Sequence, residues 1–418
     1  MTDRPADQGA AGNGTAGGRV PLFIAILMAL YVLGEASNTM FVPALPALVE
    51  LFGAPEAIVQ YTLSGYALAF AIGQLLFGPL SDRFGRRPGV LAGLVVFLAG
   101  TAIALLATSI GWLILGRVLQ GLGACAGYVG ARAMVRDRFG RQGAAPVMAL
   151  LFLCLSVAVI LSPVIGGLVV DGLGWRVGFW LQGGAALILG LVCLFALRET
   201  NARPDPHALR LLRLLRNYAD LFANPRYLAF MLTHSCGYAG ILAFFAGGAF
   251  ALTDQMGLTR QELGQGLGLV MVGFLLGIVA AMLALRRLGA DIRLLVSIST
   301  VLMAVPPVLL LLWSAFGILD LTGLMVLEFA FMFGTGLMAP NTAAGVMLEY
   351  PDRAGLAAAL LGCMQMAAAA VATAVVSILS VRYGVEAITV AQALLGGAAL
   401  LLFHLLVRMG GRRGAVGD

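Results

Sequence analysis

Between two long apolar runs of the sequence lies Gly78-Pro79-Leu80-Ser81-Asp82-Arg83-Phe84-Gly85-Arg86-Arg87-Pro88. Gly85 tolerates a positive φ and Pro88 cannot continue a preceding helix, so this stretch is predicted to make a tight reversal. Asp82 lies beside three guanidinium groups, which should keep it ionised and hydrogen-bonded. A charged hairpin between two membrane spans must lie at the water interface, and its Arg residues put it on the cytoplasmic side.

The composition of the whole chain supports this interpretation. Hydrophobic residues make up 61% of the 418 residues and charged residues only 11%, whereas a soluble domain has about 25% charged residues. We therefore expect a polytopic membrane protein, in which the net charge of +6 reflects topology and not nucleic-acid binding. All 26 basic residues are Arg, which excludes a P-loop lysine and a Schiff-base lysine.

About 20 consecutive apolar residues make one membrane span. On this rule the sequence predicts an all-α membrane protein with twelve transmembrane helices, at residues 20–43, 58–80, 88–108, 111–133, 144–168, 175–197, 226–251, 263–285, 292–313, 321–347, 355–379 and 386–407.

The spans fall into two groups of six. Residues 20–197 form an N-terminal half and residues 226–407 a C-terminal half, and the polar linker at 198–225 is predicted to hold an amphipathic helix at 208–220. Residues 1–19 are expected to be a disordered cytoplasmic tail and not a cleaved signal peptide, and residues 408–418 a second cytoplasmic tail. With both termini inside, Arg117 falls within the membrane and three Arg fall outside, namely Arg176, Arg260 and Arg382.

Span 1 carries a carboxylate within the apolar region. Glu35 shares one face of the predicted helix with Tyr31, Asn38, Thr39 and Val42. A carboxylate at that depth is costly unless it faces a polar cavity, finds a partner or takes a proton. A carrier that exchanges a proton for a substrate needs such a group, and the alternative is a structural carboxylate permanently bonded to a neighbouring helix.

Span 4 carries Arg117, with Gln120 one turn further on. At about 1.5 Å per residue, Glu35 lies about 12 Å and Arg117 about 9 Å from the outer ends of their helices. We therefore expect these two residues to pair, with Arg117 holding the carboxylate deprotonated until substrate or a proton competes. The alternative is a fixed structural ion pair.

The second half offers two further titratable residues. Glu328 in span 10 is a second candidate for proton handling or for attracting a cationic substrate, and its alternative is an interfacial acid reached by water. His234 in span 7 could titrate near neutrality, although a lone His in an apolar helix is more often a satisfied hydrogen-bonding residue. Other residues that either line a pliable cavity or simply pack in the core are Tyr238, Phe244, Phe245, Met332, Met364 and Gln365.

Several motifs resemble those of the major facilitator superfamily of transporters. The pattern Gly-x-Leu-x-Asp-Arg-x-Gly-Arg-Arg at 78–87 matches the loop 2–3 signature of this family at every fixed position, and Arg117-x-x-Gln120-Gly121 is similar to its span-4 motif. The resemblance implies the major facilitator fold, with two six-helix halves and a cytoplasmic gate at the loop. The expected gate residues are Gly78, Asp82, Arg83, Gly85, Arg86 and Arg87, with Arg136 pairing with Asp82 or Asp137 or serving only as a positive-inside anchor.

Span 5 ends in Ser162-Pro163-Val164-Ile165-Gly166-Gly167, which resembles the Gly-Pro-x-x-Gly-Gly signature of the antiporters of this superfamily, with Ser162 replacing the usual Gly. Small residues allow helices to approach closely, so Ser162, Pro163, Gly166 and Gly167 are expected to form a hinge contact between the halves.

Within the superfamily, the chain resembles the twelve-span drug:proton antiporters, in particular the bicyclomycin/chloramphenicol-resistance (Bcr/CflA) group. The supporting residues are 42–48, 78–88, 121–138 and 175–176. Members of this group commonly carry an Asp where this chain has Thr39, and we expect Glu35, one turn earlier on the same face, to substitute for it. The resemblance implies a bacterial inner-membrane protein that exports small amphipathic molecules by alternating access, driven by the proton gradient without a cofactor, and that works as a monomer.

Alternative functions are an exporter dedicated to one metabolite such as a siderophore, a nutrient symporter, and a membrane protein with no transport function. The antiporter-like motif in span 5 argues against symport. A membrane enzyme would need a metal triad, a nucleophile elbow or clustered His and Cys residues, and the sequence shows none.

Overall fold

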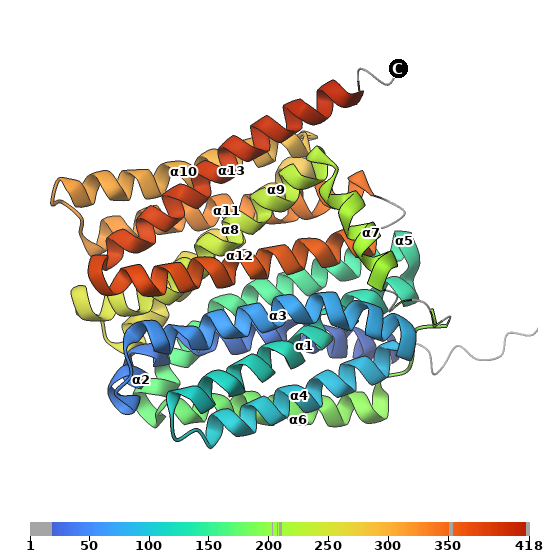
Figure 1. Ribbon diagram of the computed structural model, residues 1–418, viewed down its shortest axis with the longest axis horizontal. Helices are drawn as coiled ribbons and strands as arrows, with labels where there is room; N and C mark the ends of the chain where they lie inside the picture. Colours follow the sequence, from blue (N-terminus) through green and yellow to red (C-terminus); the bar gives the residue numbers. More distant parts are fainter. Residues whose placement is uncertain (1–18, 203, 207, 209–210, 351–353, 415–418) are drawn as a thin grey trace, which may run out of the picture.

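The computed structural model describes residues 19–202, 204–206, 208, 211–350 and 354–414. The described residues form helices joined by short connections, with no strand among them (Figure 1). Its elements, in chain order, are α1 (Arg19–Met40), the 3-10 helix η1 (Val42–Ala44), α2 (Leu45–Phe52), α3 (Glu56–Phe84), α4 (Arg86–Leu105), α5 (Ile110–Leu173), α6 (Trp175–Ala196), α7 (Leu211–Phe222), α8 (Pro225–Phe250), the π-helix η2 (Ala251–Gln255), α9 (Arg260–Leu288), α10 (Ile292–Ala315), α11 (Leu321–Glu349), α12 (Ala354–Tyr383) and α13 (Val385–Gly414).

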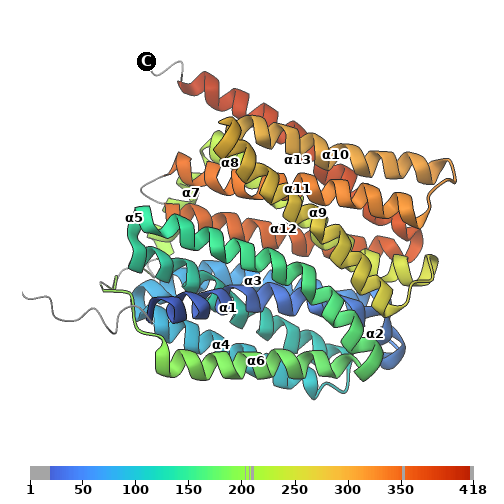
Figure 2. The same ribbon diagram turned by 180° about the vertical axis from the view of Figure 1, so that it is seen from behind.

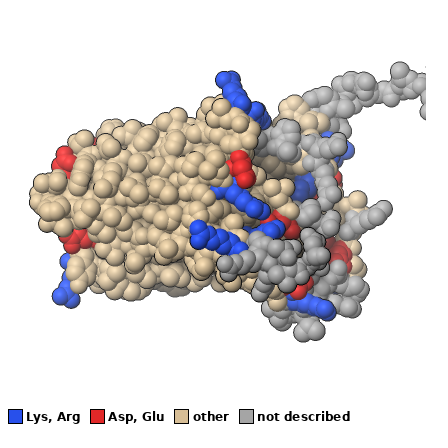
Figure 3. All heavy atoms as spheres, turned by 90° about the horizontal axis from the view of Figure 1, so that it is seen from above, with Lys and Arg blue, Asp and Glu red and all other residues tan. Residues whose placement is uncertain are grey.

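The described residues contain 12 helical segments long and apolar enough to cross a membrane. The helix α5 supplies two of them, Ile110–Gly140 and Leu150–Leu173, separated by a kink at Gly140. Figure 3 shows charged side chains at the two ends of the visible face and a broad uncharged band between them. The predicted all-α membrane fold with twelve spans is therefore confirmed.

The predicted reversal after span 2 is also confirmed. Since α3 ends at Phe84 and α4 begins at Arg86, Gly85 alone makes the turn, with φ +105°. Only a residue without a Cβ adopts this conformation readily. In the polar linker the amphipathic helix is α7, which starts at Leu211, slightly later than predicted. The predicted N-terminal tail lies outside the described residues except for Arg19, and the predicted C-terminal tail is described as far as Gly414, as part of α13.

The helices form two bundles, α1–α6 and α8–α13, that lie side by side. The bundles meet where α3 packs against α12, visible in Figure 1, and where α5 packs against α9, visible in Figure 2. The helix α8 is the most enclosed span, because 83% of its apolar window is buried inside the protein, compared with 22% for α6 and α13. The core of the second bundle is therefore built around α8.

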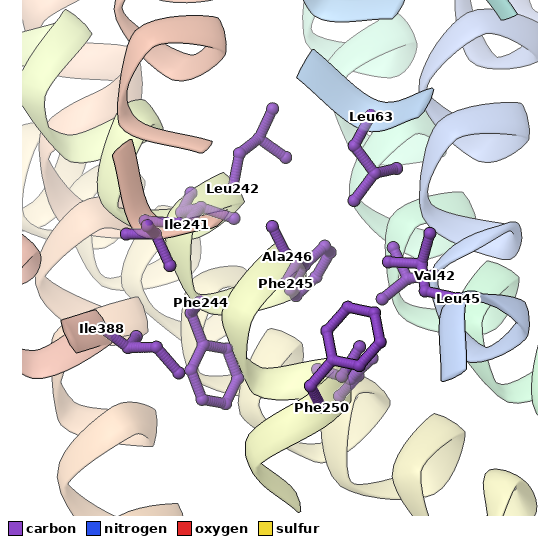
Figure 4. Packing of buried hydrophobic residues seen from close by; sticks show 14 of the residues in the cluster. Val42, Leu45, Leu63, Ile241, Leu242, Phe244, Phe245, Ala246, Phe250 and Ile388 are labelled. Carbon is purple, nitrogen blue, oxygen red and sulfur yellow. The ribbon is translucent and has the colours of Figure 1, made fainter. Parts of the chain in front are cut away.

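We define the Arg-rich end of the molecule as the end that holds Gly85 and its charged neighbours, and the opposite end as the one that holds η2. Near the opposite end, an apolar seal joins the two bundles. In Figure 4, Val42 and Leu45 of the first bundle face Phe245 and Phe250 of α8, and all four side chains are buried in one cluster. Contact between the bundles at this end is thus made by apolar packing, which excludes water.

Candidate substrate and proton site

The carboxyl group of Glu35 lies at the contact between the two bundles. It is 6% exposed, and its Oε2 accepts a hydrogen bond of 2.7 Å from the Tyr238 hydroxyl on α8. Among the described residues, no other hydrogen bond to the Glu35 side chain is found. A buried acid of the first bundle is therefore held by a donor of the second.

Arg117 is fully buried, with 0% exposure, and does not pair with Glu35. Its Nη2 donates to Asn38 Oδ1 at 2.8 Å, and its Nη1 donates to Gln120 Oε1 at 2.9 Å. The guanidinium carbon lies 4.3 Å from the ring centroid of Tyr66 and 4.7 Å from that of Phe41. Arg117 is thus stabilised by amide oxygens and aromatic faces.

The predicted Glu35–Arg117 ion pair is therefore wrong, and the physical reason is helix rotation. The rise per residue fixes the depth of each residue but not the direction in which its side chain extends. Glu35 extends toward α8, whereas Arg117 reaches the next turn of α1 at Asn38. Depth alone could not distinguish these arrangements.

Two residues that sequence reasoning missed complete the surroundings of Arg117. Gln120 Nε2 donates to Thr101 Oγ1 on α4 at 2.8 Å and to Gln182 Oε1 on α6 at 3.3 Å. Gln182 in turn donates to the backbone oxygen of Ser37 at 3.4 Å. This network joins α1, α4, α5 and α6. The signal available in the sequence was the presence of isolated polar residues, Thr101 and Gln182, within apolar spans.

The other residues on the predicted polar face of span 1 have separate roles in packing. The Tyr31 hydroxyl donates to the Tyr128 hydroxyl at 3.1 Å, and the two rings stack with centroids 4.3 Å apart. Thr39 Oγ1 donates back to the Glu35 backbone oxygen at 2.9 Å, so its hydroxyl proton is used within α1. On this face, the side chain that forms a hydrogen bond with the other bundle, within the described part of the chain, is that of Glu35.

In the second bundle, His234 has both ring nitrogens in hydrogen bonds. Its Nδ1 lies 2.7 Å from Thr342 Oγ1 and its Nε2 lies 2.8 Å from Gln365 Oε1. The expectation that a lone His in an apolar helix has satisfied partners is confirmed. Met332, Phe244 and Phe245 are buried in the same apolar cluster, which agrees with the core-packing alternative for them.

Glu328 is 0% exposed, so the alternative of an interfacial acid reached by water is wrong. Its Oε2 accepts a hydrogen bond of 3.0 Å from Gln392 Nε2 on α13. Gln392 Nε2 also lies 3.3 Å from the backbone oxygen of Gly240 on α8. Since α11 begins at Leu321, where the span was predicted to start, the span end is not what misled the prediction. The packing of α8 and α13 around the carboxyl group, which the sequence does not show, shields Glu328 from water.

At the Arg-rich end, Arg86 connects three helices of the first bundle. It forms ion pairs with Asp82 at 2.5 Å and with Asp137 at 2.9 Å, and Arg86 Nη1 donates to Ser81 Oγ at 2.8 Å. The predicted pairing of Arg136 with these acids is not found among the described residues, and Arg83 instead lies over the ring of Phe84. Arg86 pairs with Asp82 and Asp137 because α4 begins at Arg86, immediately after the turn that ends α3, and packs against α5.

Glu199, also at this end, is a residue that sequence reasoning missed. Its carboxylate accepts backbone N–H bonds from Arg86, Arg87, Thr200 and Asn201 at 2.8–3.0 Å. Partial burial opposes ionisation, but these four bonds outweigh it and lower the pKa of Glu199. An added Cβ on Gly85 would lie 2.6 Å from Glu199 Oε2. Glu199 therefore fastens the segment after α6 to the start of α4.

The motif at the end of span 5 brings α5 close to both α1 and α9. An added Cβ on Gly167 would lie 2.7 Å from the backbone oxygen of Arg260, and one on Gly264 would collide with the backbone oxygen of Pro163. Gly166 lies in the same way against the backbone oxygen of Met40. Helix backbones meet here without intervening side chains, as small residues permit.

Two six-helix bundles with buried polar residues at their contact are the architecture of a secondary transporter. The chain matches the family model described as "Major Facilitator Superfamily" over residues 27–305, which is more than half of its length. The chain belongs to the Major Facilitator Superfamily, as the sequence motifs predicted, and is a multi-pass membrane transporter of small molecules.

Two relatives that share most of the length of the chain carry names linked to drug resistance. The chain is 29% identical to multidrug resistance protein D of Escherichia coli (strain K12) over 343 residues, which cover 81% of this chain and 84% of that protein. It is 27% identical to the bicyclomycin resistance protein homolog of Haemophilus influenzae over 364 residues, 84% of this chain and 87% of that protein. The resemblance to the Bcr/CflA group thus agrees with these relatives.

Among solved structures, the chain resembles a D-xylose-proton symporter with a TM-score of 0.74, at 14% sequence identity and with 92% of this chain and 97% of that chain covered. It resembles a POT family transporter with a TM-score of 0.71, also at 14% identity, with 93% and 96% covered. At this identity the likeness shows the fold and says nothing of the substrate.

Proposed function

We propose that the protein is a proton-coupled exporter of small amphipathic molecules such as drugs, which works as an antiporter by alternating access. Membership of the superfamily and the names of the relatives in Escherichia coli and Haemophilus influenzae support this function. The Arg-rich end then faces the cytoplasm of a bacterial cell, and the protein lies in the inner membrane as a monomer driven by the proton gradient.

The hydrogen bond between Glu35 and Tyr238 is the observation that carries the proposal. It joins the two bundles, so it must break when they part on the side from which substrate enters or leaves. The surroundings of the carboxyl group then change from protein to water, and its affinity for a proton differs between the two states. A difference in affinity between states is the requirement for coupling a proton to a conformational change.

Arg117 supports this site as a fixed positive charge. It is held by Asn38, one turn from Glu35 on α1, and by Gln120 on its own helix. Because no carboxylate neutralises Arg117 among the described residues, its charge is available to the cavity that opens between the bundles. It would bind hydrogen-bond acceptors of the substrate and favour the ionised form of Glu35 during the cycle. His234, Gln365 and Tyr238 would line the facing wall.

The packing at each end supports a gate at one end and a hinge at the other. The Asp82–Arg86–Asp137 cluster fastens α3, α4 and α5 together, so the first bundle moves as one body at the cytoplasmic end. The close contact of Gly167 with α9 lets the bundles pivot on each other, since no side chains interlock there.

The test uses purified protein in liposomes that contain a pH-sensitive dye. A proton gradient is imposed, a panel of amphipathic drugs and siderophores is added, and wild type is compared with Glu35→Gln. The matched control is Glu50→Gln, because Glu50 is an exposed carboxylate on α2. We expect drug-evoked proton flux that is lost in Glu35→Gln and kept in Glu50→Gln.

Three other results would change the proposal. Flux evoked by one siderophore alone would indicate a dedicated exporter. Substrate uptake along the proton gradient would indicate symport. The complete absence of substrate-evoked flux would contradict proton coupling.

A further inference from the structure

The pair formed by Glu328 and Gln392 leaves two buried oxygen atoms without hydrogen-bond partners. Gln392 Nε2 donates to Glu328 Oε2 at 3.0 Å. Within the part of the chain that the structure describes, Glu328 Oε1 and Gln392 Oε1 are buried and have no partner. The unsatisfied atoms are therefore acceptors on two groups that already touch.

An ionised carboxylate does not fit these surroundings. Both orphan atoms accept hydrogen bonds and neither can donate one, so an ionised Glu328 would leave both unsatisfied and would bury a charge. No ion pair of Glu328 is found among the described residues.

The titratable groups on the elements around Glu328 have other positions or partners. His234 on α8 is held by Thr342 and Gln365, and Glu386 on α13 accepts from Ser314. Among the other charged side chains that the structure describes on α9–α13, His404 is exposed. The rest lie near helix ends, namely Arg260, Glu262, Arg286, Arg287, Arg293, Glu349, Arg382 and Arg408.

We propose that Glu328 and Gln392 form a second proton-binding site, in the C-terminal half, which is loaded in this conformation. One proton on Glu328 Oε1 would donate to Gln392 Oε1, while the Gln392 amide donates to Glu328 Oε2. The result is an acid–amide pair with two hydrogen bonds, in which a single proton satisfies both orphan atoms. No bond other than O–H forms or breaks when the proton binds or leaves.

The helix α8 connects this site to Glu35. Tyr238 donates to Glu35, and the backbone oxygen of Gly240, two residues further along, accepts from Gln392. Gly240 lies directly against α11, because an added Cβ would be 2.5 Å from Phe331 Cζ. A movement of α8 that separates Tyr238 from Glu35 therefore also displaces a partner of the Gln392 amide. The role of the second site in transport rests on the function proposed above, whereas its protonation does not.

Infrared difference spectroscopy of the purified full-length protein at neutral pH tests this proposal, without substrate or a proton gradient. The C=O stretch of a protonated carboxylic acid is separate from the amide and carboxylate bands and shifts in D₂O. We expect such a band in wild type, lost in Glu328→Gln and kept in Glu35→Gln.

A second variant keeps the test independent of the folding of Glu328→Gln. Gln392→Leu retains the acid but removes both amide hydrogen bonds, so the band should shift to higher frequency. A spectrum in which Glu328→Gln leaves the band unchanged, or in which Gln392→Leu leaves it unshifted, would overturn the proposal. Failure of drug-evoked flux in liposomes would contradict the proposed function and leave this result standing.

Discussion

The hydroxyl of Tyr238 on α8 donates a hydrogen bond of 2.7 Å to the carboxyl group of Glu35 on α1, and this bond joins the two bundles in the interior of the protein. Each helix belongs to a different half, so the bond can exist only while the halves are together at this depth. It connects the state of one side chain to the arrangement of the whole molecule.

Tyr238→Phe removes this donor and keeps the ring. A hydrogen bond to a charged group contributes about 1.5 kcal/mol or more, which corresponds to a factor of about 10 in an equilibrium constant. We expect substrate-evoked proton flux in liposomes to fall about tenfold, because the ionised form of Glu35 loses its stabilising partner. The control is Tyr61→Phe, since no hydrogen bond of the half-buried Tyr61 is found in the described chain. Equal flux in both variants would show that the bond has no part in coupling.

Arg117→Lys keeps the charge but loses the planar fork that reaches Asn38 and Gln120 together. We expect a loss of stability of about 1–3 kcal/mol, because a buried amide oxygen is left without its donor, and a fall in drug-evoked flux of at least about tenfold. Thermal unfolding in detergent and the liposome assay measure the two effects. Arg138→Lys is the control, because Arg138 lies over the Phe23 ring at the Arg-rich end. An Arg117→Lys variant that matches wild type in both measurements would refute a specific role for the guanidinium group.

Gly167→Leu places a side chain where α5 meets the backbone of α9. Overpacking at such a contact costs about 1–3 kcal/mol and forces the helices apart. We therefore expect transport to be lost while the protein still inserts in the membrane. Gly172→Leu is a matched control on the same helix, since an added Cβ there has nothing within 4 Å. The hinge contact would be disproved by a Gly167→Leu variant that transports as well as Gly172→Leu.

Glu199→Gln is expected to weaken the Arg-rich end in a pH-dependent way. The pKa of Glu199 is lowered in the folded protein. Such a group adds stability above its unfolded pKa of about 4.3, and this contribution is lost as the pH falls through the lower folded pKa. Wild type should therefore unfold at a higher temperature than Glu199→Gln at neutral pH. The difference should shrink as the pH falls below about 4 and vanish only below the lowered folded pKa.

The exposed Glu50→Gln serves as the control for this pH series. A constant difference between wild type and Glu199→Gln at every pH would mean that the ionised carboxylate is not what fastens this segment.

Much of the architecture could be predicted from the sequence because it depends on local properties. The length of each apolar run sets each span, and the conformational freedom of Gly85 sets the turn between α3 and α4. The depth of Glu35 and Arg117 also follows from the rise of a helix. Their partners could not be predicted, because the partner of a side chain depends on how its helix is rotated against the others.

The sequence by itself determined that this chain is a twelve-span membrane protein of two halves, with buried acids in both, since apolar length and residue spacing act along a single helix. Tertiary structure alone decided that Glu35 meets Tyr238, that Arg117 meets Asn38 and that Glu328 meets Gln392. These pairs lie far apart in the sequence, and their contacts arise from the packing of helices whose rotation is set by many weak apolar interactions together.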